Sequence, residues 1–118
     1  MKRDSPEYAR IQSWRADLKR RFPDWGSDQA MRRWPVDEKK LAVGKKVTGE
    51  VVANMGNLIW LDIGVSIPAH LYYFNRKDTC TGPPRISDYP DIGTKIECRI
   101  THFADGRISV TQRNLVDL

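Results

Sequence analysis

From Val43 onward the apolar residues of this chain alternate with polar ones, and this two-residue period restricts its fold more than any other feature. Five short stretches show the alternation: residues 47–51, 58–63, 67–71, 95–100 and 107–111. Successive side chains of a strand point to opposite faces, so the pattern predicts half-buried strands. Because a flat sheet of five strands would leave unpaired edges, we expect a small closed or half-closed barrel over residues 43–114.

The same alternation predicts which side chains form the barrel core. The expected inward-facing set is Ile59, Leu61, Ile63, Ile67, Ala69, Leu71, Ile96, Cys98, Ile100, Ile108 and Val110. One long connection, residues 75–91, separates the third and fourth stretches, and it contains Gly82-Pro83-Pro84. That composition predicts a loop rather than a helix.

Residues 1–42 show helical spacing instead. An apolar stripe recurs every three or four residues at Tyr8, Ile11, Trp14, Leu18 and Phe22. This stripe predicts a helix over residues 5–22, and a second short helix is expected to begin after Ser27 and to run to about Trp34, ended by Pro35. We therefore expect a helical N-terminal extension that either packs on the barrel or a partner, or contacts nucleic acid directly.

Charge is concentrated in this extension. The whole chain carries a net charge of +5. Residues 1–42 hold eleven Lys/Arg and seven Asp/Glu, a net +4, whereas residues 43–118 hold nine and eight, a net +1. A basic balance favours polyanions such as nucleic acid. The nearly neutral barrel needs local clustering, or help from the extension, to hold a phosphate backbone.

Several other classes of function are disfavoured. Cys80 and Cys98 show no ligand spacing and are interpreted as reduced thiols, and His70 and His102 lack partners for a metal site. The sequence offers no nucleophile elbow, phosphate-binding glycine loop or paired carboxylates, so we expect no enzyme and no cofactor. There is no apolar run of membrane-spanning length, and the first ten residues resemble neither a secretory signal nor a good transit peptide.

Several short motifs follow one another in a fixed order along residues 43–114. They are Val43-Gly44, Gly49-Glu50-Val51, Leu61-Asp62-Ile63-Gly64, Ile92-Gly93 and Arg107-Ile108-Ser109-Val110-Thr111-Gln112-Arg113. In this order and register they resemble the RNA-binding domain first described in ribosomal protein S-one, an oligonucleotide-binding (OB) fold. The resemblance implies an all-β five-stranded OB-fold barrel, here with an α-helical N-terminal extension, that binds RNA.

The sequence departs from the family pattern at three positions. Asn57 replaces an aromatic residue, Leu58 replaces a glycine, and Tyr72 replaces a histidine while keeping a π face. The loss of one aromatic suggests a member adapted to a single RNA site. The extension and the modified barrel are together similar to single-domain mitochondrial small-subunit ribosomal proteins. That similarity implies an organellar matrix, with the cytoplasm as the other expected compartment.

Binding of single-stranded RNA needs flat π surfaces for bases and cations for phosphates. Trp60 is predicted to face outward and is the first stacking candidate, and Tyr72 is the second. The alternative is that the N-terminal helix covers Trp60. The cation candidates are Lys46, Arg99, Arg107 and Arg113. Asp62 and Glu97 are also predicted to face outward, where they would repel phosphate.

Three functions fit these features. The first is a non-catalytic RNA-binding protein, ribosomal or ribosome-associated, that contacts rRNA or mRNA during translation. The second is an RNA-binding module in transcript processing or decay, and the third is a protein–protein adaptor whose barrel has lost its nucleic-acid face. The expected partners are RNA and ribosomal proteins, with no membrane; the sequence leaves the oligomeric state and the identity of the RNA open.

Overall fold

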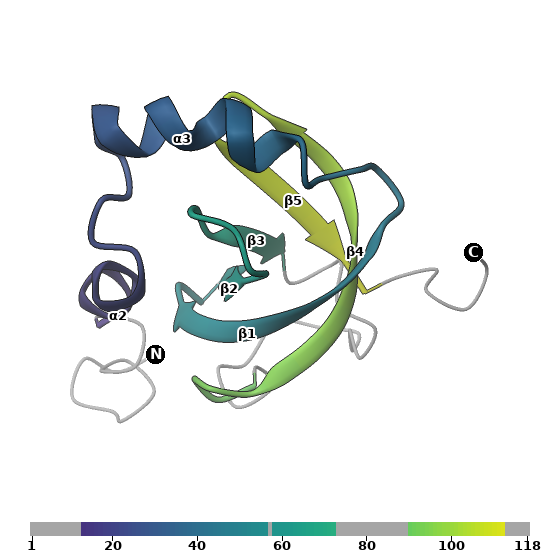
Figure 1. Cartoon of the computed structure of the whole chain (residues 1–118). Coiled ribbons are helices and arrows are strands. Elements are labelled where there is room, and N and C mark those ends of the chain that lie inside the picture. Colours follow the sequence, from purple (N-terminus) through teal and green to yellow (C-terminus); the bar gives the residue numbers. More distant parts are fainter. Residues whose placement is uncertain (1–12, 57, 73–89, 113–118) are drawn as a thin grey trace.

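A computed structural model describes residues 13–56, 58–72 and 90–112 of the chain. The elements in chain order are α2 (Trp14–Arg21), α3 (Asp28–Glu38), β1 (Lys46–Asn54), β2 (Leu58–Asp62), β3 (Ala69–Tyr72), β4 (Lys95–Ala104) and β5 (Arg107–Thr111). The strands close into one barrel in the order β1-β2-β3-β5-β4 (Figure 1). The predicted five-stranded barrel with a helical N-terminal part is confirmed. The predictions for Cys80, Arg113, Asn57, the first part of the N-terminal helix and residues 75–89 lie outside the described residues.

Barrel closure depends on a parallel pairing between β3 and β5, in which Ala69 lies opposite Ile108. The other neighbouring strands are antiparallel. Gly49 allows β1 to approach β2 closely, because a Cβ atom there would lie 3.1 Å from the Leu61 Cβ atom. This glycine belongs to the Gly49-Glu50-Val51 motif of the first predicted strand, so the close approach gives that motif a physical reason.

The barrel interior holds the side chains that alternation placed there. Ile59, Leu61, Ile67, Ala69, Leu71, Cys98, Ile100, Ile108 and Val110 are buried, and Ile63 and Ile96 are half-buried. Burial raises the pKa of the Cys98 thiol to about 12, so this cysteine stays protonated at physiological pH. The core prediction therefore holds, apart from two positions near strand ends.

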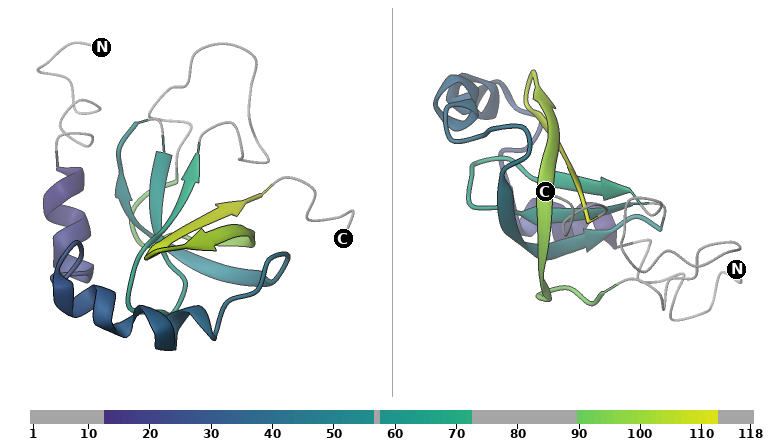
Figure 2. Two further views of the ribbon diagram at one scale, coloured as in Figure 1. Left: turned by 90° about the horizontal axis from the view of Figure 1, so that it is seen from above. Right: turned by 90° about the vertical axis from the view of Figure 1, so that its right-hand side faces the viewer.

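Helix α2 packs on the outside of the barrel through its apolar stripe. Leu18 and Phe22 are buried against Val52 and Ala53 of β1. The register of β1 against β2 shifts between Val51 and Ala53, so this segment buries side chains on both of its faces. A second, smaller core thus joins the extension to the barrel, and Figure 2 shows α2 lying along one side of the strands.

Helix α3 lies across one end of the barrel (Figures 1 and 2). Its predicted start is confirmed, because the Ser27 side chain accepts a hydrogen bond from the Ala30 N–H at 3.2 Å. Its predicted end at Pro35 is wrong, since the helix continues to Glu38. Tertiary contacts in the last turns outweigh the lost backbone hydrogen bond: Trp34 joins the main core, and Asp37 is buried.

The Asp37 carboxylate connects α3 to the loop between β2 and β3. Its Oδ1 atom accepts hydrogen bonds from the Ser66 hydroxyl at 3.2 Å and from the Ser66 N–H at 3.4 Å. Together with Trp34, which lies edge-on to Phe103, this contact fixes α3 over the barrel end. Neither α2 nor α3 has the length and apolar character needed to cross a membrane.

Candidate nucleic-acid interface

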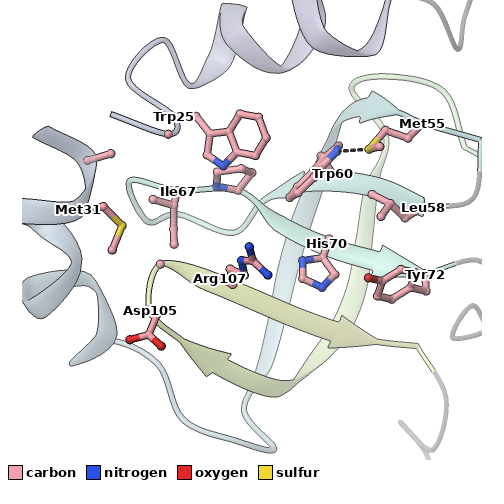
Figure 3. A pocket seen from close by; sticks show the side chains of 14 residues that line it. Trp25, Met31, Met55, Leu58, Trp60, Ile67, His70, Tyr72, Asp105 and Arg107 are labelled. Atoms are coloured by element: carbon pink, nitrogen blue, oxygen red, sulfur yellow. Dashed lines mark hydrogen bonds between the residues drawn. The ribbon is translucent and has the colours of Figure 1, made fainter. Parts of the chain in front are cut away.

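A groove of about 430 Å³ lies on the outer face of β2, β3 and β5, where the N-terminal extension meets the barrel. Its lining comes from the α2–α3 linker, α3 and the three strands, and includes Trp25, Met31, Trp60, His70, Tyr72 and Arg107 (Figure 3). This volume falls within the range of about 300–1,000 Å³ for small-molecule sites. The face formed by β2 and β3, with the β1–β2 and β4–β5 loops beside it, is where OB folds bind oligonucleotides.

Four rings form a continuous row across this groove. Trp25 lies edge-to-face with Trp60 at 5.3 Å between ring centroids. Trp60 lies edge-to-face with His70 at 5.7 Å, and His70 with Tyr72 at 5.2 Å. The register explains the order, because Trp60 lies opposite His70 across β2 and β3, and Tyr72 follows His70 on the same face of β3.

Trp60 has both an exposed and a packed side. Its indole N–H donates a hydrogen bond to the Met55 sulfur at 3.0 Å, which fixes the ring orientation (Figure 3). Part of the ring packs against the small core formed by Leu18 and Phe22, so the side chain is half-buried. Trp60 therefore faces outward, as alternation predicts. It also packs in part under the N-terminal helix, as the alternative interpretation predicts.

The polar groups of the groove centre on His70 and Arg107. Nε2 of His70 lies 2.9 Å from the Ser109 hydroxyl on the neighbouring strand. Burial, and then the positive charge of Arg107, lower the pKa of His70 below its usual value of 6.5. The neutral imidazole is therefore favoured in the free protein, and the exposed Arg107 supplies the positive charge of this region.

The predicted site residues separate into two groups. Trp60, Tyr72 and Arg107 come together around the groove. Lys46 on β1 lies opposite Arg99 on β4 in the sheet register, and neither residue lines the groove. The Arg99 guanidinium also donates a hydrogen bond to the Gly44 carbonyl at 2.6 Å, so this side chain has a structural contact.

Sequence reasoning missed two residues of the row, Trp25 and His70. For His70 a signal existed, because it lies two residues before Tyr72 in an alternating strand and must share its face. Trp25 had no such signal, since it reaches the barrel only through the docking of the two helices.

The acidic side chains expected to repel phosphate are not part of the groove lining. Oδ2 of Asp62 accepts a hydrogen bond from Arg21 Nε at 2.8 Å, and Glu50 contacts the same guanidinium at 3.0 Å. Asp62, and then Glu50, raise the pKa of Arg21. Glu97 is exposed on β4, where it lies opposite Thr48 of β1 in the sheet register. Arg21 of the extension therefore offsets one of the two negative charges that Asp62 and Glu50 place beside the barrel face.

This arrangement offers stacking surfaces, one cation and an apolar floor, which are the groups that bind a single-stranded nucleic acid. Among the described residues, no three His, Cys, Asp or Glu side chains are grouped so that they could hold a metal ion.

Comparison with known proteins gives a match in structure but not in sequence. No family model matches the chain, and no curated protein matches it significantly. A chain of the a/eIF2alpha–aDim2p–rRNA complex from Pyrococcus horikoshii OT3 is similar, with a TM-score of 0.55 and 16% identity. That match covers 64% of this chain and 46% of the other, so this chain spans less than half the length of that relative.

Two further solved structures are similar over the same extent. The uncharacterized protein MJ1198 from Methanocaldococcus jannaschii has a TM-score of 0.52 at 13% identity, and the match covers 64% of this chain and 96% of that protein. GSP13 from Bacillus subtilis has a TM-score of 0.54 at 14% identity, over 66% and 60% of the two chains. At these identities the likeness shows the fold, which is that of an OB-type five-stranded barrel.

Proposed function

We propose that this chain is a non-catalytic RNA-binding protein that holds single-stranded RNA on the face formed by β2, β3 and β5. The row of four rings from Trp25 to Tyr72 is the observation that carries the proposal. Bases stack on aromatic side chains without regard to sequence, and each stacked base contributes about 1–3 kcal/mol to binding. Arg107 beside the row supplies a cation for the backbone, and the complex that contains one of the similar structures includes rRNA.

Substitution of Trp60 tests this proposal. We expect Trp60→Ala to weaken binding of a fluorescein-labelled single-stranded RNA dodecamer by about 1–3 kcal/mol, measured by fluorescence anisotropy. Because Trp60 also packs against α2, the matched control is Trp14→Ala, which removes a tryptophan from the same small core but not from the groove. Circular dichroism melting verifies that both variants fold. Equal affinities of Trp60→Ala and the parent would reject the groove as the RNA site.

The finer part of the proposal is that the RNA is ribosomal or is bound during translation. The support is the basic extension, which holds a net +4 of the +5 on the chain. Co-sedimentation of the tagged protein with a ribosomal subunit from its native cells tests this point. A protein that binds RNA but sediments alone would instead act in transcript processing or decay, and one that binds no RNA would be an adaptor. The organellar compartment stays a prediction.

A further inference from the structure

The N-terminal extension closes one end of the groove. Met31 of α3 lies directly on the turn between β4 and β5, and a Cβ atom added at Gly106 would lie 2.7 Å from the Met31 sulfur. This turn is one of the two loops between which OB folds hold a nucleic-acid strand. In this chain, α3 covers this turn and, through Met31, forms the wall of the groove at that end (Figure 3).

Trp25 forms a second wall beside the closed end. It belongs to the linker between α2 and α3, and it lies edge-to-face with Trp60 rather than stacked on it. Ile67 and Pro68, from the loop before β3, are also part of the lining here. The row of rings thus ends in a recess with an apolar floor.

Charges along the groove change sign toward this closed end. Among the described residues that line it, Arg107 is the one cation and Asp105 is the one carboxylate. Asp105 lies in the turn that α3 covers, two residues before Arg107. A strand that continued past Arg107 over the turn would bring its next phosphates toward Asp105, which repels them.

We propose that the groove binds the terminal nucleotide of a single-stranded RNA rather than an internal stretch of it. The strand follows the rings from Tyr72 toward Trp25, and its last base occupies the recess beside Trp25 and Trp60. Arg107 contacts the last backbone phosphate. This inference rests on the proposed RNA-binding function and adds the part of the RNA that is recognised.

Competition between linear and circular RNA tests the proposal. The ligands are one octanucleotide with free ends, the same sequence circularised, and two versions in which a hairpin blocks the 5′ or the 3′ end. Fluorescence anisotropy with the full chain should give the linear RNA an affinity at least about tenfold higher than the circle, equivalent to about one stacked base. One of the two hairpin versions should bind like the circle, which identifies the recognised end.

Equal affinities for the linear and circular octanucleotides would overturn terminal recognition but leave the proposed function intact. Binding of neither ligand would overturn both. Trp25→Ala should lower the affinity for linear RNA to that of the circle while leaving the circle unchanged, and the control Trp14→Ala should keep the preference. Trp25 is partly exposed, so we expect this variant to fold, and circular dichroism verifies it. A preference that survives Trp25→Ala in a folded protein would overturn the assignment of the last base to this recess.

Discussion

His70 lies in the middle of the ring row, and its protonation is linked to stability and, under the proposed function, to RNA binding. Its pKa in the folded protein is lowered by burial and then by Arg107, relative to the usual 6.5 of the unfolded chain. The unfolded state therefore binds protons more readily than the folded state as the pH falls below about 6.5. The stability that neutral His70 contributes is present above pH 6.5 and is lost as the pH falls through the folded-state pKa.

RNA should shift this titration in the opposite direction, because nearby phosphates favour the imidazolium form. We expect the pKa of His70, measured by NMR chemical shifts, to lie below 6.5 in the free protein and to rise when a single-stranded RNA is bound. His102, exposed on β4 and outside the groove lining, supplies the comparison signal in the same spectrum. A His70 titration that RNA leaves unchanged would place the ligand elsewhere on the protein.

For a single residue, the sequence predicts which face of the sheet its side chain lies on better than it predicts which residues the side chain contacts. Alternation placed Trp60 on the outer surface and Cys98 inside, because strand geometry fixes each side from sequence position alone. It could not separate Arg107, which reaches the groove, from Arg99, which bonds the Gly44 carbonyl. Both are outward-facing arginines, and the strand that lies next to each decides the difference.

Among the elements, α2 is held on the barrel by its buried stripe, and Leu18 is its most deeply buried member. We expect Leu18→Ala to lower the free energy of unfolding by about 2–5 kcal/mol, the usual effect of truncating a fully buried leucine. Urea denaturation measures this value. The exposed neighbour provides the control, since Lys19→Ala should change stability by less than about 0.5 kcal/mol. Similar values for the two variants would show that α2 is not docked in solution.

Helix α3 depends on a different kind of contact, the buried Asp37 carboxylate. Asp37→Ala leaves the Ser66 N–H and hydroxyl without this acceptor, so we expect a loss of about 1–3 kcal/mol in unfolding free energy. Glu38→Ala, at the exposed next position, is the matched control. In a double-mutant cycle, Ser66→Ala should reduce the effect of Asp37→Ala, and strict additivity of the two substitutions would argue against their hydrogen bond.

The C-terminal end of α3 is a feature that local sequence rules predict wrongly. Pro35 removes a hydrogen bond donor, and local rules place a helix end there. Burial of Trp34 and Asp37 on either side of it extends the helix to Glu38. The strands were predicted more accurately, because their two-residue period determines which side chains face the barrel interior. Docking of the helices, and hence the closed groove, depends on contacts between segments far apart in the chain.

In the molecule as a whole, the N-terminal extension has two roles: it packs against the barrel, and it carries most of the net positive charge. Its residues Leu18, Phe22 and Trp34 are buried against the barrel, so removing residues 1–40 would expose apolar surface as well as delete charge. Truncation therefore cannot isolate the contribution of the cations. Substitution of exposed cations on α2 is the cleaner experiment, because α2 packs against the same small core as Trp60 and so lies beside the groove.

We expect the variant Arg15→Gln, Lys19→Gln, Arg20→Gln to weaken RNA binding and to flatten its salt dependence. Each lost phosphate contact should remove about 0.7 from the slope of log affinity against log salt concentration for single strands. The matched control is Arg32→Gln, Lys39→Gln, Lys40→Gln, which changes the net charge equally at exposed positions of α3 and the segment after it. Since both variants lose three positive charges, long-range attraction falls by a similar amount in each, and a flatter slope in the α2 variant alone reports direct contact. If the two slopes are equal to that of the parent protein, α2 does not contact RNA, and its role is to support Trp60 and position the wall that ends the groove.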